Sequence, residues 1–450
     1  MYNANLIYAD DEIEENLKVI AENVFPAPLR IQQNNEKRLV FYDYFMLDNR
    51  GLTEQYLDAL FDSEYEILFV GCPNGEQSKE IIDKLEVHKV QFVFIDEKQE
   101  LSNAKIIFDS IINFNPAIIL AHTSPWDVAG LMAISRFEKC SKRYLVNITD
   151  HAFWLGTKVF DYFIEFRDYG YNISKNYRRI DAKNLLKLPY YPNINKNIPF
   201  AGFDFDARGK KIVLSGGSIY KIQGSPVFFD LVKYILSTYE DTIFLFLGNG
   251  DASYLQKFID DNNFQNRFYY RKERKDIWEV FKHCDMFLNT YPITGGLMTQ
   301  YACMAGVVPV TLNDGGDNSD GNIYELLLSD YGLNFQCESL ESCKAKIDEY
   351  MLNPNALKSD GLQLTKAVIS RKMFSEMLLN YLETPVNKMV FNAYNVDIKR
   401  FSKQYIQRFN ENDGMSYYSC FVRKDVKYLL KFPIYYIKYI WFKTKYGSKW

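Results

Sequence analysis

Two polar residues at the end of a strand-like run are the first candidates for chemistry. Asp150 and His151 stand in NITDHAFWLG, where an apolar run at 143–149 ends. An imidazole beside a carboxylate can take a proton from a hydroxyl, with Asp150 either orienting His151 or acting as the base itself. The alternative is structural: His151 caps a following helix, while Phe153 and Trp154 fill the core.

A glycine-rich turn later in the chain has the composition of an anion site. The turn LSGGSIYK follows a predicted strand and contains Gly216, Gly217, Ser218 and Lys221. Its glycines let the backbone approach an anionic group, while the lysine and the amides of the next helix supply positive charge. A tight strand-to-helix turn with a surface lysine explains the same pattern.

A second turn, LGNGD, contains Gly248, Asn249 and Gly250. It is similar to a nucleotide-binding turn, but the third glycine of the dinucleotide fingerprint is missing. The chain also has no P-loop sequence, which argues against a P-loop NTPase. The turn is therefore either a ligand contact or a plain glycine turn.

The segment from residue 285 to residue 312 gives the strongest signal. It consists of a strand, a polar turn, a helix rich in small residues and another strand. Gly295 and Gly296 open the helix, whose unpaired N–H groups form a ready site for a diphosphate. The hydroxyl-bearing candidates in the segment are Thr290, Thr294 and Thr299. A plain strand–helix–strand unit is the alternative.

These turns require a scaffold, and the chain supplies two similar sets of elements. Short apolar runs alternate with helical stretches, which is typical of parallel sheets covered on both faces. A linker rich in Pro, Asn and Gly separates the two sets at 186–211. The first set has expected strands at 38–45, 65–71, 90–95, 117–122 and 143–149. The second has expected strands at 211–217, 242–250, 267–271, 286–290 and 307–312.

The predicted fold is α/β, with two Rossmann-like, doubly wound parallel-sheet domains that face each other across a cleft. We expect an N-terminal domain at 1–195, a nucleotide-binding domain at 196–375 and a helical extension at 376–450. Open sheets of this kind bind ligands at the carboxyl ends of their strands. Residues 357–410 are expected to be mostly helical.

The order of these turns resembles the donor domain of GT-B-fold glycosyltransferases, as in the family 4 (group 1) enzymes of polysaccharide biosynthesis and the O-GlcNAc-transferase-like enzymes. The resemblance covers roughly residues 210–330, and AGVVPV at 305–310 is the last motif in its series. It implies the GT-B fold and a nucleotide diphosphate sugar of UDP or GDP type as donor, with no cofactor and no metal ion. His151 matches a family histidine near the reacting sugar. Arg271 matches the region that meets the base and diphosphate; a solvated basic loop is the alternative.

The sequence departs from family 4 at one point. Two glutamates usually flank the polar turn, and Ile293 and Tyr301 stand at their positions. This departure puts the retaining mechanism of family 4 in doubt and leaves the stereochemistry open, since the O-GlcNAc-transferase-like enzymes invert.

The resemblance implies a metal-independent, hexosyltransferase-like enzyme that passes a sugar to a glycan or lipid-linked acceptor in bacterial surface polysaccharide synthesis, such as capsule or O-antigen. Two alternatives stay open: a catalytically inactive homologue that serves as a binding or assembly subunit, and a nucleotide-sugar 2-epimerase. FDFD at 203–206 contains a D-x-D triplet but lies in the linker, so we predict no metal site.

The charge distribution separates the body of the chain from its end. The formal net charge is −4, which argues against a nucleic-acid partner. Residues 427–450 interleave lysines with aromatic side chains, which suits an anionic membrane surface or a helix packed on the first domain. An acidic N-terminus, scattered cysteines and no long apolar run favour a cytoplasmic protein, peripheral on the inner face of the membrane.

Overall fold

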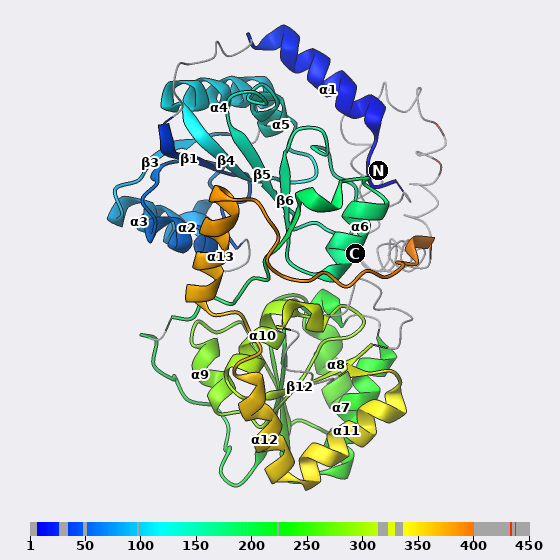
Figure 1. The fold of residues 1–450 in the computed structure, drawn as a ribbon. Coiled ribbons are helices and arrows are strands. Elements are labelled where there is room, and N and C mark those ends of the chain that lie inside the picture. Colours follow the sequence, from blue (N-terminus) through cyan, green and yellow to red (C-terminus); the bar gives the residue numbers. More distant parts are fainter. Residues whose placement is uncertain are drawn as a thin grey trace.

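The computed structural model contains two α/β units, drawn one above the other in Figure 1. Every strand pair in both sheets is parallel. The predicted fold class is therefore confirmed. The structure describes residues 7–26, 35–47, 52–96, 99–195, 197–222, 225–313, 323–328 and 336–399, together with 433 and 437.

The N-terminal sheet has seven strands in the order β3-β2-β1-β4-β5-β6-β7. The winding reverses between β1 and β4, which places a topological switch point at the carboxyl ends of these two strands. The strands are β1 (Asn35–Asp43), β2 (Glu66–Gly71), β3 (Gln91–Phe94), β4 (Pro116–His122), β5 (Lys142–Val146), β6 (Tyr162–Glu165) and β7 (Leu185–Lys187).

Helices cover both faces of this sheet because its strands are apolar on both faces. Along β1, Leu39 and Phe41 join the core formed with α2, α3 and α13, while Val40 and Tyr42 face α1, α4 and α5. Each fully buried side chain of this size contributes about 1.5–3 kcal/mol. The helices are α1 (Asp11–Val24), α2 (Thr53–Phe61), α3 (Lys79–Val87), α4 (Glu100–Phe114), α5 (Val128–Ser135), α6 (Asp168–Asn176) and α13 (Arg371–Glu383), with 3-10 turns η1 (Gly75–Ser78) and η2 (Ala182–Asn184).

The C-terminal sheet has six strands in the order β10-β9-β8-β11-β12-β13, so its switch point lies between β8 and β11. Its strands are β8 (Lys211–Gly216), β9 (Thr242–Leu247), β10 (Phe268–Arg271), β11 (Met286–Leu288), β12 (Val308–Leu312) and β13 (Gln336–Cys337). Its helices are α7 (Pro226–Thr238), α8 (Ser253–Asp261), α9 (Ile277–Lys282), α10 (Gly296–Met304), α11 (Leu340–Leu352) and α12 (Pro354–Leu364), with η3 (Ile219–Lys221) and η4 (Ile323–Leu326).

The chain returns to the first unit after α12. Helix α13 packs against α2, and Phe374 of α13 lies edge-on to Tyr56 of α2. The expected boundary at residue 375 falls inside this helix, which starts at Arg371. The expectation of a mostly helical stretch holds to residue 383, but residues 385–397 form an irregular segment that runs beside α6.

The expectations from sequence did not include α1, β6, α6 and β7 of the first unit or β13 of the second. Strands β6 and β7 are short, with four and three residues, so they carry little periodic signal. Within the described residues, no helix has the length and apolar character needed to cross a membrane. The basic aromatic segment at 427–450 lies outside the described residues, apart from 433 and 437.

Candidate active site

The first two glycine turns of the C-terminal unit touch each other at the strand ends. The turn after β8 and the turn after β9 pair through the amide of Ile219 and the carbonyl of Asn249, 2.9 Å apart. A Cβ atom on Gly248 would overlap the carbonyl oxygen of Gly217, so only glycine fits there. Gly217 and Gly250 have φ values of 130° and 137°, which favour glycine. Ser218 precedes η3 on the same turn.

The third turn, between β11 and α10, is organised by an asparagine that the sequence analysis did not single out. Oδ1 of the buried Asn289 accepts the amides of Thr290 at 2.9 Å and Gly295 at 3.0 Å. Its Nδ2 donates to the hydroxyls of Thr299 at 2.9 Å and Thr311 at 3.2 Å. One side chain thereby fixes the path of the turn. Its place directly after a strand was the available cue.

The threonines of this turn have structural partners. Thr290 donates its hydroxyl to the carbonyl of Ile293 at 2.6 Å, and Thr299 donates its hydroxyl to the carbonyl of Gly295 at 2.9 Å. Thr290 and Thr299 are each 1% exposed. These two hydroxyls therefore hold the turn in shape, whereas Thr294 contributes its backbone carbonyl, which accepts a hydrogen bond from Lys221.

The electrostatic potential is positive where the first and third turns meet, because Lys221 and the N-terminus of α10 lie together there. Nζ of Lys221 donates to the carbonyl of Thr294 at 3.2 Å, beside the start of α10. The first amides of α10, from Gly296 on, have no carbonyl partner within the helix. A lysine and a helix N-terminus side by side attract an anion such as a diphosphate. The chain sequence thus brings Gly216, Lys221 and Gly295 to the switch point between β8 and β11.

Arg271 lies apart from this cluster. It ends β10, the outermost strand of the sheet, and its Nε donates to Asp204 of the linker at 2.7 Å. The guanidinium also lies over the ring of Tyr269. Asp206, the other aspartate of the linker triplet, pairs with Arg208. Among the described residues, no group of three or more His, Cys, Asp or Glu side chains is arranged to hold a metal ion.

Asp150 and His151 lie together on the facing side, after β5. Nδ1 of His151 is 3.5 Å from Oδ1 of Asp150, and the imidazole is partly exposed. Asp150 is 1% exposed and accepts two hydrogen bonds from Arg167, at 2.6 and 2.9 Å. Burial alone would raise the pKa of Asp150, but Arg167 and His151 outweigh burial and hold this pKa below its usual range. Asp150 is thus a fixed carboxylate that can orient His151.

The structural interpretation of this segment holds in part. Phe153 and Trp154 are buried, and Trp154 belongs to the core on one face of the sheet. His151, however, stands in an irregular stretch, and the next helix, α6, begins only at Asp168. His151 therefore caps no helix.

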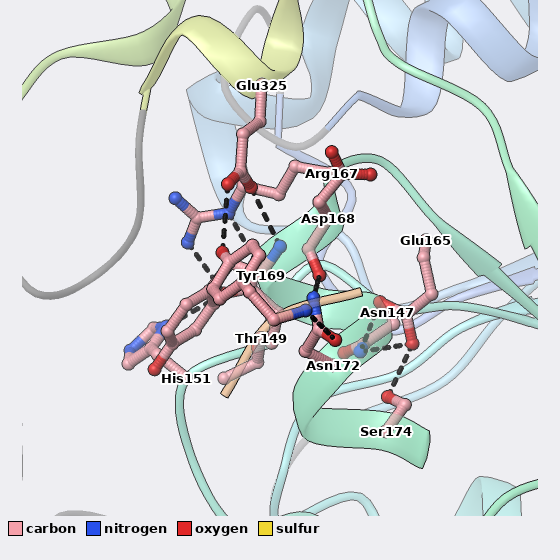
Figure 2. A network of polar contacts seen from close by, with 12 residues as sticks. Asn147, Thr149, His151, Glu165, Arg167, Asp168, Tyr169, Asn172, Ser174 and Glu325 are labelled. Carbon is pink, nitrogen blue, oxygen red and sulfur yellow. Dashed lines mark hydrogen bonds and ion pairs between the residues drawn. The ribbon is translucent and has the colours of Figure 1, made fainter. Parts of the chain in front are cut away.

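Figure 2 shows the larger polar network to which this pair belongs. Glu165, at the end of β6, accepts from Asn147 at 2.9 and 3.0 Å and from Ser174 at 2.5 Å. Burial raises the pKa of Glu165 to about 7. Arg178 donates to the carbonyl of Ala152 at 2.6 Å and stacks over Trp154. The alternating charged residues at the end of β6 were the signal that the sequence analysis missed.

The two sides meet across the junction between the units. The hydroxyl of Tyr190 lies only 2.7 Å from where a Cβ atom of Gly296 would stand, so a side chain at this position would have to displace Tyr190. Burial raises the pKa of Tyr190 to about 12, against the opposing charge of Arg167. Tyr190 also accepts a hydrogen bond at its carbonyl from Gln300 of α10, at 2.6 Å. The residues that hold His151 and the start of α10 are therefore neighbours.

A second contact across the junction involves a carboxylate. Glu325 of η4 accepts the amide of Tyr169 at 2.7 Å, in the first turn of α6, and the hydroxyl of Tyr394 at 2.8 Å. Burial raises the pKa of Glu325, and Arg167 opposes that rise. By contrast, a surface cavity of about 310 Å³ lies at the opposite edge of the N-terminal sheet, beside Phe61 and His88, away from both sides of this junction.

Comparisons with known proteins identify the fold. The sequence matches no protein-family model and no curated protein. A mutant O-GlcNAc transferase from Thermobaculum terrenum is similar at a TM-score of 0.57 and 13% identity, over 90% of this chain and 76% of that chain. Anabaena Alr3699/HepE, solved with UDP and glucose, is similar at 0.56 and 12% identity, over 78% and 100%. UDP-GlcNAc 2-epimerase from Neisseria meningitidis, bound to UDP-GlcNAc, is similar at 0.54 and 9% identity, over 76% and 100%. The chain has the GT-B fold.

Proposed function

We propose that this chain is a glycosyltransferase that moves a sugar from a nucleotide diphosphate sugar of UDP or GDP type to a glycan or lipid-linked acceptor. The observation that supports the proposal is the contact between the two units. Tyr190 lies against Gly296 at the start of α10, and it is close enough to Arg167 and Asp150 for their charges to affect its pKa. An anion site and an acid–base pair thus face each other in a fold that solved glycosyltransferases share.

On the donor side, backbone amides provide most of the binding groups. The start of α10 and Lys221 hold the diphosphate, and Gly295, whose Cβ position has its nearest atom 3.6 Å away, lets it approach the chain. When the bond from the anomeric carbon to the diphosphate oxygen breaks, negative charge grows on that oxygen. A helix N-terminus and an ammonium group stabilise this charge without a metal ion or cofactor.

The acceptor side supplies the base. The acceptor hydroxyl attacks the anomeric carbon, and His151 takes the proton of that hydroxyl. Asp150, paired with Arg167, keeps the imidazole in position and stabilises the imidazolium that forms. The fixed carboxylate makes Asp150 the orienting group and His151 the base.

A glycine substitution tests the donor site with little risk to the fold. Gly295 has a negative φ of −106°, and the nearest atom to a new Cβ there is 3.6 Å away. Gly295→Ala should therefore keep the thermal stability and weaken the binding of UDP or GDP, measured by calorimetry, by about tenfold or more. Lys221→Met should do the same, whereas Lys257→Met, on the exposed face of α8, should bind as the wild type does. Unchanged nucleotide affinity in both site variants would refute the donor site.

A nucleotide-sugar 2-epimerase is the second candidate function. It is favoured by the similarity to a 2-epimerase over the full length of that chain. An epimerase would isomerise UDP-GlcNAc with no acceptor present, which NMR of the sugar ring detects directly. A catalytically inactive homologue would bind nucleotide but would not turn over any donor. Its nucleotide affinity would be the same in the wild type and in His151→Ala.

We also propose a setting in bacterial surface polysaccharide synthesis, such as capsule or O-antigen, on the inner face of the cytoplasmic membrane. Its support is the basic aromatic composition of 427–450. The full chain should sediment with anionic vesicles. A full-length variant with Lys438, Lys443 and Lys445 changed to Gln should sediment less. Equal sedimentation of the two proteins would remove the membrane proposal.

A further inference from the structure

Trp126 is an exposed aromatic side chain in an otherwise buried turn. It is 55% exposed, although Pro125 before it and Asp127 after it are buried. Single apolar residues on a surface are common and need no explanation by themselves. Trp126 differs from such residues in its position, because its turn joins β4 to α5 at the carboxyl edge of the N-terminal sheet, where open sheets bind ligands.

The turn that carries Trp126 is held rigidly. The amide of Asp127 donates to the carbonyl of Ser124 at 3.1 Å, and Oδ1 of Asp127 accepts the amide of Gly130 at 2.8 Å. The carbonyl of His122 accepts the amide of Tyr44 at 2.9 Å. Residues fixed on both sides keep the indole in one place, which reduces the ordering cost of binding a ligand.

The turn adjoins the proposed base. Strand β4 lies between β1 and β5, and the segment after β5 carries His151. That segment packs against α5, since a Cβ atom on Gly156 would lie 2.9 Å from Leu131. The carboxyl ends of neighbouring parallel strands meet at one edge of a sheet, so the Trp126 turn borders the region where the acceptor hydroxyl reacts.

Two buried polar atoms at this edge of the sheet have no hydrogen-bond partner among the described residues. Nδ1 of His122 is 3.0 Å from Oδ1 of Asp43, and both residues are almost fully buried. The two atoms without a partner are Nε2 of His122 and the hydroxyl oxygen of Ser124. Buried polar atoms are usually paired, so two unpaired atoms, one at the end of β4 and one in the turn that follows, indicate that this edge is not built for packing alone.

From these observations we propose that the turn at 123–127 is a subsite for a sugar ring of the acceptor, with Trp126 as its platform. A pyranose presents a face of C–H groups, and the negative face of an indole attracts such groups while it shields their apolar area from water. The inference rests on the proposed glycosyl transfer and deepens it, because it identifies the group next to Trp126 as a saccharide and not a lipid chain.

Fluorine NMR tests the subsite in the full chain. The protein is labelled with 5-fluorotryptophan, and the Trp126 signal is assigned by its loss in Trp126→Phe. Methyl glycosides of glucose, galactose and N-acetylglucosamine are titrated in turn, with and without UDP, and glycerol serves as a polyol that lacks a ring. We expect at least one glycoside to shift the Trp126 signal and glycerol to leave it in place. A signal that no glycoside moves would overturn the subsite.

Variants separate stacking from apolar contact. Saturation-transfer NMR should show glycoside binding weakened about tenfold or more in Trp126→Leu, which keeps apolar bulk without the ring, and little changed in Trp126→Tyr. Equal binding by the Leu variant and the wild type would overturn the proposal. UDP binding reports separately on the proposed function: if UDP fails to bind but glycosides still shift Trp126, the transferase proposal fails and the saccharide site stands.

Discussion

The two sides of the junction are organised by different means. On the N-terminal side, charged side chains hold one another: Arg167 pairs with Asp150, which lies beside His151. On the C-terminal side, glycines and backbone amides do most of the work, and the neutral side chain of Asn289 sets their path. One side is organised by charge in a buried setting, the other by the close approach of the backbone.

This difference determines which kind of substitution destabilises each side most. A buried ion pair suffers most when one partner is removed, since the remaining charge is left without compensation. A backbone turn suffers most when atoms are added, since there is no space for them.

Arg167→Met should cause the largest loss of stability. It leaves the carboxylate of Asp150 buried without its guanidinium partner, which costs about 3–5 kcal/mol. Urea unfolding followed by circular dichroism measures the loss. Arg208→Met, which removes a fully exposed pair with Asp206, should leave stability nearly unchanged, because solvent screens that pair.

The double variant Asp150→Asn with Arg167→Met shows whether charge is the cause. Because no unpaired charge is left, it should recover much of the stability lost in Arg167→Met. The ion pair would not be what organises this side if the double variant were as unstable as the single one. Activity should stay low in the double variant even where stability is recovered, since Asp150→Asn leaves no carboxylate to orient His151.

Gly248→Ala should come next, with a loss of up to about 3 kcal/mol. The new methyl group collides with the carbonyl of Gly217, so the first two turns must separate. Gly361→Ala is the matched control, because its methyl group collides in the same way with the carbonyl of Gly306, before β12. Both variants should lose stability, but only Gly248→Ala should also lose UDP affinity. A parallel loss of affinity in Gly361→Ala would contradict a local role for the turn.

The same contrast explains what the sequence could predict. Glycine turns can be recognised in a sequence because their function depends on residue type and on local spacing, so Gly216, Gly248 and Gly295 were found. Both parallel sheets followed from apolar runs of strand length. The partners of Asp150 could not be found in this way. Arg167 and Arg178 reach it only after β6 and α6 fold back, and β6 is too short to show a period.

Glu165→Gln should change how stability depends on pH. The pKa of Glu165 is raised to about 7 by burial, against 4.5 as its ordinary value. The folded state therefore binds the proton more tightly than the unfolded chain, and stability falls as pH rises from about 4.5 to 7. Removal of this titration should reduce that fall by roughly 2 kcal/mol.

Unfolding free energies at pH 5 and pH 7.5 measure this effect. Asp127, whose pKa burial also raises to about 7, contributes with the same sign, so Glu165→Gln should flatten the profile only in part. An unchanged slope in the variant would show that Glu165 does not titrate in this window. Asp150 acts in the opposite sense, because its lowered pKa adds stability that is lost only in more acidic solution.

Glu325→Gln should have the smallest effect, and it tests where the two sides join. Glu325 belongs to the C-terminal unit but accepts hydrogen bonds from Tyr169 and Tyr394 of the facing segments. Burial raises the pKa of Glu325, so its charge has a cost that offsets the attraction of Arg167 and of the α6 N-terminus. The amide keeps an acceptor oxygen and removes that charge, so stability should change by less than about 1 kcal/mol.

Glu325→Ala separates the hydrogen bonds from the charge. It leaves the amide of Tyr169 and the hydroxyl of Tyr394 without their acceptor, which should cost about 1–3 kcal/mol. If Glu325→Gln instead proved as damaging as Glu325→Ala, the charge itself would hold the units together. Charge would then be important at the contact between the units as well as beside Asp150. The C-terminal unit would depend on the charge of Glu325 for its position against the N-terminal unit.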